Sequence, residues 1–177
     1  DGHFILSSGL HSPQYVQCAQ LMSVPDKAQS ICNSLAEKIK NEFKNFDLIL
    51  SPAMGGIIIG YEIGRILKKK TIFSERVNGV FQLRRDFQIK KNQNVLIIED
   101  VITTGKSSLE CSKLVTGNNA NIIGYACIID RSKGESQIKS KIVSQIQLDI
   151  PTYTKENLPN ELLTIKAVKP GSRNLNE

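Results

Sequence analysis

Short apolar runs alternate with amphipathic stretches along most of this 177-residue chain. Apolar residues recur at three- and four-residue spacing over 26–43, which predicts an amphipathic helix with Asp26 as its N-cap. A glycine-opened helix is predicted over 55–70, with lysines in its last turn, where the helix dipole favours cations. Two further helices are predicted, over 104–115 and, from a weaker pattern, near 134–142.

Apolar runs between these helices predict five buried strands, over 47–51, 71–74, 95–99, 121–130 and 144–149. A projecting β-hairpin is predicted around the turn dipeptide Asn78-Gly79. Strands alternating with helices are typical of a parallel sheet covered on both faces. We therefore predict an α/β fold with a doubly wound, mostly parallel five-stranded sheet flanked by helices. Strand order 2-1-3-4-5 is common in such folds, and it makes the first and third strands neighbours.

The length of the chain indicates one domain, because 177 residues are too few for two ordinary domains. We expect a single domain over 1–177, with a core over about 26–150. The segments at about 1–25 and 151–177 are expected to form a small hood. The N-terminal sequence has neither a basic region nor a cleavage-site pattern, so no export signal is predicted, although its abrupt start leaves room for a preceding segment.

Composition is that of a soluble globular protein, with 40% hydrophobic and 23% charged residues. No apolar run approaches the roughly 20 residues that span a bilayer. The four cysteines are scattered, which argues against a disulfide framework or a structural metal and favours a reducing cytoplasm. The formal charge of +6 comes from lysines spread along the chain, a distribution that favours solvated helix faces over a nucleic-acid surface.

Two adjacent carboxylates, Glu99 and Asp100, stand where the third predicted strand ends. Burying two like charges is costly, and a helix cap would account for only one of them. The Thr-Thr-Gly-Lys-Ser turn that follows would open a helix, and free N–H groups at a helix N-terminus suit a phosphate. Carboxylates suit hydroxyl groups or a divalent cation. A phosphorylated sugar offers both features in one molecule.

A nucleotide P-loop is the rival interpretation of this turn. Its first glycine would fall at position 100, where Asp100 would point negative charge at the phosphates. The loop "SPAMGG" after the first strand places Gly55 and Gly56 at another helix start, although a plain tight turn would have the same sequence. Because the first and third strands are predicted neighbours, both loops should open onto one crevice.

The stretch "VLIIEDVITTGKS" resembles the phosphoribosyl diphosphate signature of the type I phosphoribosyltransferases. Other stretches resemble the orotate-specific members of that family: "GHFILSSGLHSPQYVQ", "SPAMGGIIIGYEIGR", "IIDRSKGE" and "KPGSR". The resemblance implies a cytoplasmic, Mg²⁺-dependent transferase, working as a homodimer. Such an enzyme makes orotidine 5′-monophosphate and diphosphate from orotate and phosphoribosyl diphosphate, in de novo pyrimidine (UMP) biosynthesis.

The resemblance also implies roles for individual residues, with the acid pair on the ribose hydroxyls and Mg²⁺ held through substrate and water rather than by direct protein ligands. Phosphoribosyl diphosphate contacts are implied for Glu99, Asp100, Val101, Ile102, Thr103, Thr104, Gly105, Lys106 and Ser107 and, at the diphosphate, for Ala53, Met54, Gly55 and Gly56. Orotate contacts are implied for Thr103, Arg131, Tyr15 and Val16.

Two features depart from the family pattern. Many members have a lysine in the hood where this chain has Ser7. Many also have a longer mobile loop that carries lysine and histidine and reaches into the neighbouring subunit. Here the hairpin leaves three arginines to neutralise the diphosphate, although exposed arginines are by default simply solvated. These catalytic candidates are Arg76, Arg84 and Arg85. The hairpin also carries four hydrophobic residues, which would either pack on a partner subunit or cover their own domain: Val77, Val80, Phe81 and Leu83.

Two alternatives stay open. The first is a phosphoribosyltransferase for another nucleobase, and Arg131 argues against it because orotate carries a carboxylate and purines do not. The second is a regulator that senses phosphoribosyl diphosphate and binds nucleic acid, and the scattered lysines argue against it. The expected partners are therefore the two small substrates and a second copy of the chain, without nucleic acid or membrane.

Overall fold

A computed structural model describes residues 1–6 and 9–170, so Ser7 and the end of the "KPGSR" stretch lie outside the described residues. The chain divides into two compact units. The larger unit is Cys18–Leu148, and the smaller one joins Asp1–Gln17 to the chain from Asp149 onward.

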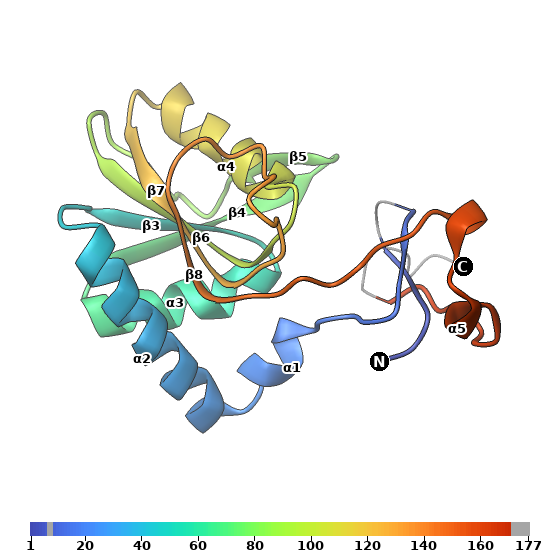
Figure 1. Ribbon diagram of the computed structural model, residues 1–177. Helices are drawn as coiled ribbons and strands as arrows, with labels where there is room; N and C mark the ends of the chain where they lie inside the picture. Colours follow the sequence, from blue (N-terminus) through green and yellow to red (C-terminus); the bar gives the residue numbers. More distant parts are fainter. Residues whose placement is uncertain (7–8, 171–177) are drawn as a thin grey trace. The chain divides into compact units, whose positions relative to one another are not determined.

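The larger unit contains a six-stranded sheet in the order β5-β4-β3-β6-β7-β8 (Figure 1). All neighbouring pairs are parallel except β4 and β5. The five parallel strands therefore have the predicted order 2-1-3-4-5, and β5, the second arm of the predicted hairpin, adds an antiparallel edge strand. The strands are β3 (Leu48–Pro52), β4 (Lys70–Val77), β5 (Val80–Leu83), β6 (Asn94–Ile102), β7 (Asn121–Asp130) and β8 (Ile142–Gln147).

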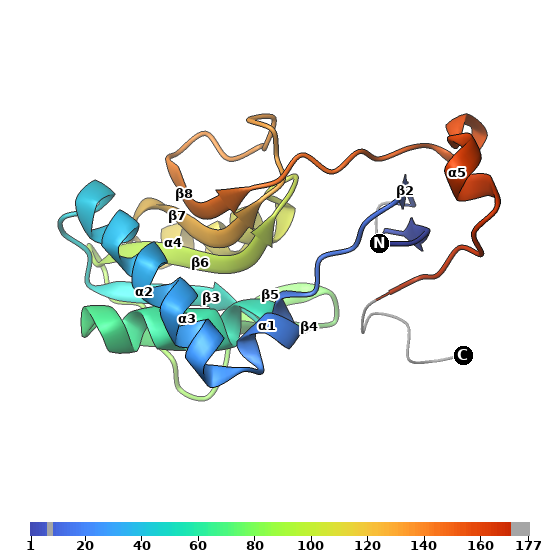
Figure 2. The ribbon, with the colours of Figure 1, turned by 60° about the horizontal axis from the view of Figure 1, so that its bottom comes forward.

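Helices cover both faces of this sheet. Helices α2 (Pro25–Glu42) and α3 (Gly55–Leu67) lie side by side on one face, and the short α1 (Cys18–Met22) contacts both (Figures 1 and 2). Helix α4 (Lys106–Gly117) packs on the other face. Because both faces are covered, the central strands contain long apolar runs, and β3 is buried along its whole length.

Two helix ends differ from prediction. Val24, not Asp26, is the N-cap of α2, because Pro25 occupies the first turn, and Asp26 lies in that turn, where a carboxylate still favours the dipole. Helix α3 ends at Leu67 with Lys68 in the left-handed conformation, so the lysines predicted in its last turn follow the helix instead.

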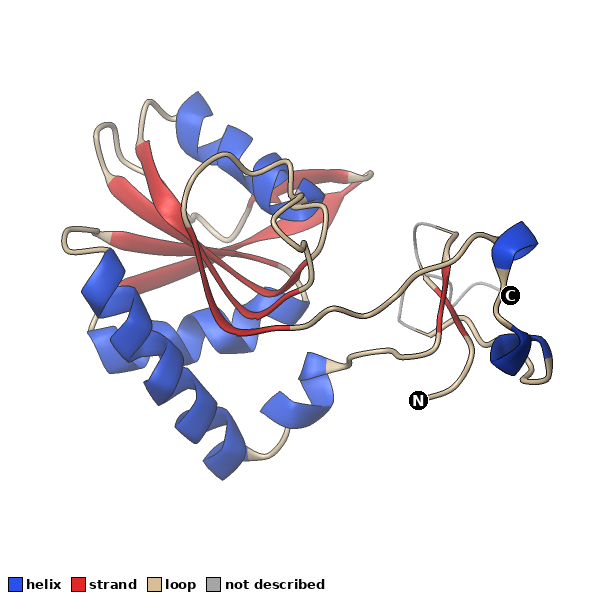
Figure 3. Ribbon diagram, in the orientation of Figure 1, coloured by secondary structure: helices blue, strands red, loops and turns tan. Residues whose placement is uncertain are grey.

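The helix predicted near 134–142 is wrong. This crossover between β7 and β8 is a loop, drawn in tan in Figure 3. Lys133 and Gly134 both have positive φ, of 53° and 80°, which no α-helix accommodates. The backbone bonds elsewhere too, since Gln137 N–H donates to Thr104 O at 2.9 Å. Strand β8 then starts at Ile142, two residues before the predicted start.

The smaller unit combines both ends of the chain. Strands β1 (Phe4–Ile5) and β2 (His11–Ser12) pair antiparallel, and the C-terminal segment adds a 3₁₀ turn (Lys155–Asn157) and α5 (Asn160–Leu163). His11 and Tyr153 exchange two backbone hydrogen bonds, at 2.8 and 2.9 Å. The buried rings of His3 and His11 share a 2.6 Å hydrogen bond. Among the described residues of either unit, no helix is long and apolar enough to cross a membrane.

Candidate active site

Two loops meet where the neighbouring parallel strands β3 and β6 end. Leu50 of β3 pairs with Ile97 of β6, so the segments that follow leave the sheet at the same edge. The start of α3 touches the end of β6, because a Cβ added to Gly56 would lie 3.0 Å from Ile98 O. The structure thus brings together the "SPAMGG" and "EDVITTGKS" loops, as the predicted strand order requires.

The acid pair divides between the two faces of the sheet. Successive side chains of a strand point to opposite faces, so Glu99 and Asp100 cannot point the same way. Ser108 Oγ on α4 donates to Glu99 Oε2 at 2.5 Å. Asp100 lies against α3, where a Cβ added to Gly55 would be 2.6 Å from its Cγ. Each half-buried carboxylate is therefore placed by the helix on its own face, which a single helix cap does not explain.

The turn after the acids opens α4 and is braced from outside. Gly105 is the N-cap, with φ of 80°, and a Cβ there would lie 2.7 Å from Ile138 Cγ1. Both the positive φ and the lack of space therefore require glycine. Thr103, Thr104 and Lys106 are exposed at the free N-terminus of the helix. Exposed hydroxyls, an ammonium group and backbone N–H groups at one helix start suit a phosphate.

The diphosphate-side loop is short and tied to its neighbours. Ala53 N–H donates to Ser74 O of β4 at 2.8 Å, and the peptide bond between Ala53 and Met54 is cis. Helix α3 begins at Gly55, which is exposed. A second helix N-terminus thus opens next to Asp100, as expected for a ligand with anionic groups at both ends.

Arg131 directly follows β7 and is anchored to the same loop. Its backbone N–H donates to Ile102 O at 2.8 Å. Its Nε is buried and has no hydrogen-bond partner among the described residues. Burial lowers the pKa of Arg131 from its ordinary value, because the charged form loses solvation. A half-buried arginine whose buried Nε–H is unsatisfied favours an anionic partner.

The three hairpin arginines are not held alike. Arg76 forms an ion pair with Glu110 of α4 and stacks 4.0 Å above the ring of Phe81. Arg85 donates two hydrogen bonds of 3.1 Å to Glu75. Arg84 forms no ion pair with any residue that the structure describes. A diphosphate contact for these arginines stays a prediction.

Tyr15 and Val16 belong to the smaller unit, where Tyr15 packs 5.8 Å from the ring of Phe4. Their orotate contacts also stay predictions. The hairpin hydrophobes have a clearer outcome, because Phe81 is buried within the larger unit while Val80 remains 62% exposed at the turn.

Sequence reasoning missed three residues that shape the site. Ser108 binds Glu99, Gln137 binds the backbone of Thr104, and Ile138 packs against Gly105. Ser108 carries a weak signal, as a polar residue on the inner face of an amphipathic helix. Gln137 and Ile138 carry no such signal, because the pattern of the segment around them predicts a helix.

Metal ligation by protein side chains alone has little support here. Among the described residues, no group of three or more histidine, cysteine or acidic side chains is arranged to hold a metal ion. A Mg²⁺ ion held through substrate oxygens and water, as this ion commonly is, would need no such group.

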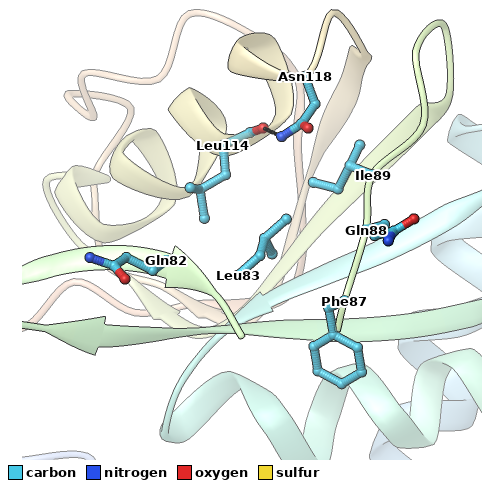
Figure 4. Close-up of a pocket in the computed structure, with 7 residues that line it drawn as sticks. All are labelled: Gln82, Leu83, Phe87, Gln88, Ile89, Leu114 and Asn118. Carbon is cyan, nitrogen blue, oxygen red and sulfur yellow. Dashed lines mark hydrogen bonds between the residues drawn. The ribbon is translucent and has the colours of Figure 1, made fainter. Parts of the chain in front are cut away.

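Two cavities within the described residues lie apart from these loops. One of about 480 Å³ is formed by β5, the segment after it and the end of α4 (Figure 4). Another, of about 300 Å³, lies between the α1–α2 corner and α3. Neither is lined by a residue with a predicted substrate role. The residues lining the larger cavity are Gln82, Leu83, Phe87, Gln88, Ile89, Leu114 and Asn118.

Comparison with known proteins assigns the chain to a class. The phosphoribosyl transferase domain matches residues 25–156, so the chain belongs to the phosphoribosyltransferase family. It is 45% identical over 175 residues to an orotate phosphoribosyltransferase of Parvibaculum lavamentivorans, covering 98% of this chain and 90% of that protein. It is 47% identical over 174 residues to the orotate phosphoribosyltransferase of Rhizorhabdus wittichii, covering 98% and 89%.

Solved structures show the same fold at much lower sequence identity. Orotate phosphoribosyltransferase from Aeropyrum pernix superposes with a TM-score of 0.72 at 21% identity, over 83% of this chain and 86% of that one. An adenine phosphoribosyltransferase superposes with a TM-score of 0.68 at 17% identity, over 78% and 89%. Since both kinds of enzyme share the fold, it does not select the base.

Proposed function

We infer that this chain is an orotate phosphoribosyltransferase. It transfers the phosphoribosyl group of 5-phosphoribosyl 1-diphosphate to orotate and releases orotidine 5′-monophosphate and diphosphate, a step of de novo pyrimidine biosynthesis. Near-full-length identity of 45–47% to orotate enzymes supports the choice of base. The structural observation that carries it is the buried, unpartnered Nε of Arg131, next to the phosphate loop, because orotate is a base with a carboxylate.

The reaction breaks the C1–O bond to diphosphate and forms a bond from C1 to the ring nitrogen of the orotate anion. Positive charge develops on the ribose while negative charge develops on the diphosphate. Glu99 and Asp100 would accept hydrogen bonds from the ribose hydroxyls and stabilise the first charge, and backbone N–H groups around Gly55 and Gly105 would stabilise the anions. The attacking group comes from orotate, so no protein nucleophile is needed.

We propose Mg²⁺ as the cofactor, held through substrate oxygens and water beside the acid pair. When bound, it would neutralise charge on the diphosphate and favour its departure. The hairpin arginines are the cationic side chains that the sequence analysis assigns to the leaving diphosphate. Arg76 and Arg85 would have to exchange a carboxylate for the diphosphate, whereas Arg84 would not.

Orotate depletion in the presence of Mg²⁺ and phosphoribosyl diphosphate tests the activity, with adenine, hypoxanthine and uracil supplied in parallel reactions. We expect consumption of orotate alone, matched by release of one diphosphate per orotate. Preferential use of another base would support the alternative transferase. Binding of phosphoribosyl diphosphate without turnover of any base would support the regulator.

We also propose a homodimer that uses the exposed face of α3. Met54, Ile58 and Tyr61 follow each other at helical spacing and are 80%, 52% and 66% exposed. Adjacent exposed apolar residues of this size commonly mark an interface. Sedimentation should give a dimer for the wild type and a monomer for Tyr61→Asp. A wild-type monomer at assay concentration would exclude the proposal.

Sharing of sites within this dimer is tested by mixing two impaired variants, Asp100→Asn and Arg84→Ala/Arg85→Ala. If the hairpin serves the partner's site, subunit exchange should raise activity above the mean of the two variants, because a mixed dimer contains one intact site. A mixture that gives only the mean despite verified exchange would restrict the arginines to their own subunit.

For the compartment, we propose the cytoplasm. All four cysteines are buried free thiols in the described structure, as a reducing environment favours. Burial raises the pKa of Cys18, Cys32 and Cys111 to about 12, so these thiols stay protonated at neutral pH. Fractionation of cells with a tagged chain would test this assignment.

A further inference from the structure

Three hydroxyl groups on the sheet face that α4 covers form two separate sets of hydrogen bonds, one from Tyr125 through Ser112 to a backbone carbonyl and one from Ser108 to Glu99. Ser108 and Ser112 lie one turn apart on the buried side of α4, and Tyr125 lies on β7 beneath it. Ser112 Oγ donates to Ser108 O at 2.9 Å and lies 2.6 Å from Tyr125 OH. Since Ser112 has a single hydroxyl proton, Tyr125 must be the donor in the second bond. Burial raises the pKa of Tyr125, which keeps that proton in place.

Strand register explains why Glu99 shares this face with the three hydroxyl groups. Ile97 pairs with Tyr125 and Glu99 pairs with Cys127, so these four side chains share the sheet face that α4 covers. Ser108 is fully buried, and its hydroxyl has Glu99 Oε2 as its acceptor at 2.5 Å. A buried serine in a helix more often bonds back to a carbonyl of its own helix, as Ser112 does. Ser108 instead bonds to the carboxylate.

We propose that Ser108 is a positioning residue for the reaction, holding the Glu99 carboxylate in the orientation that receives the ribose hydroxyls of phosphoribosyl diphosphate. This rests on the proposed function only for the role of Glu99. A glutamate has three rotatable side-chain bonds, and a fixed acceptor is more effective than one that must be ordered during the reaction. Ser108 itself does not need to touch the substrate.

The test compares Ser108→Ala with the matched control Ser112→Ala. Both substitutions remove a buried hydroxyl from the same helix face, and both should lower the denaturation midpoint. Only Ser108→Ala should lower kcat/KM for phosphoribosyl diphosphate, by about tenfold, the scale of one hydrogen bond to a charged group. The KM for orotate should remain unchanged. Ser108→Thr, which keeps the hydroxyl, should recover part of the loss.

Calorimetric binding of phosphoribosyl diphosphate provides a readout without turnover. Ser108→Ala should weaken binding in the wild-type background and have no further effect in Glu99→Ala, because the carboxylate it positions is absent there. Equal kinetic losses in the two serine variants, or an undiminished Ser108→Ala effect in Glu99→Ala, would overturn the proposal. Failure of the proposed function would look different, since the wild type would then not consume orotate at all.

Discussion

The end of β6 and the β4–β5 hairpin, with the turn that follows it, both supply charged residues to the predicted mechanism, but the structure holds them differently. Glu99 is bonded to a fully buried serine, and Asp100 is packed against Gly55. By contrast, Arg85 is 60% exposed and bonds to Glu75 on the strand next to it. The acids are thus fixed by the packing of two helices on a sheet, whereas the arginine is held by two side chains of β4, through its bonds to Glu75 and its position 5.6 Å from the ring of Phe73.

This difference indicates how the two regions would act. Groups that stabilise a developing charge are most effective when they are already in place, and buried contacts hold side chains in place. Exposed cations on an edge hairpin can instead adapt to a ligand, and ordering them takes part of the binding energy. Substitutions in the acid loop should therefore have larger effects on turnover than substitutions in the hairpin.

The largest loss is expected for Asp100→Asn. Removal of one transition-state contact typically lowers turnover about a hundredfold or more, and the amide keeps the shape of the side chain. We expect an intact circular dichroism spectrum and an unchanged denaturation midpoint beside that loss in steady-state kinetics. Near-normal turnover would show that the acid only caps a helix.

Arg131→Ala should have the next largest effect, confined to one substrate. Loss of a charge-assisted contact is worth roughly 1.5–3 kcal/mol, which corresponds to a rise in the orotate KM of about ten- to a hundredfold. Binding of phosphoribosyl diphosphate, measured by calorimetry, should remain nearly intact. Equal weakening of both substrates would place Arg131 in the scaffold of the loop.

Gly55→Ala tests whether close packing places Asp100. The added methyl would lie 2.6 Å from Asp100 Cγ, so the carboxylate has to move. We expect a loss of turnover of about tenfold, because misplacement of a catalytic group on this scale is costly even when the fold persists. Gly117→Ala is the matched control, since nothing lies within 4 Å of the added atom. Equal activities of the two variants would mean that Asp100 tolerates displacement.

The same contrast marks what the sequence could predict. Strands β3 and β7 were located within one residue at either end, because buried parallel strands leave unbroken apolar runs. The two adjacent acids at a strand end indicated a binding loop there, and the predicted strand order placed it beside the loop after β3. The division of Glu99 and Asp100 between two sheet faces also follows from strand alternation, but their partners do not. Gly55 and Ser108 are separated in sequence from the acids that they contact, and packing alone brings them together.

The misassigned crossover illustrates the opposite case. Residues 134–142 have a weak helical pattern, yet the segment is a loop that contacts the phosphate loop. The backbone N–H of Gln137 donates to Thr104 O, and the side chain of Ile138 packs against Gly105. Tertiary contacts of this kind override local preference. No pattern within the segment could reveal these contacts, because the residues contacted, Thr104 and Gly105, lie in another loop.

The smallest effect on stability is expected for Arg85→Ala. Water competes with an exposed ion pair, so the urea midpoint at pH 7 should change little, as measured by circular dichroism. The Arg85 hydrogen bonds lower the pKa of Glu75 below its ordinary 4.5. Any contribution of the pair is therefore complete above pH 4.5 and is lost as pH falls through the lowered value, so wild type and variant should converge in acid.

Arg84→Ala is the matched substitution at the adjacent position, and the turnover of the two variants is compared. Arg84 contributes to the lowered pKa of Glu75 but forms no ion pair with it, so it can turn toward a diphosphate more readily than Arg85, which does. We expect Arg84→Ala to lower turnover several-fold and Arg85→Ala to lower it less. A large drop in the midpoint for Arg85→Ala would contradict the comparison, because it would show that packing holds the hairpin as firmly as the acid loop. Equal losses of turnover would instead show that both arginines reach the substrate, and that the ion pair with Glu75 breaks when it binds.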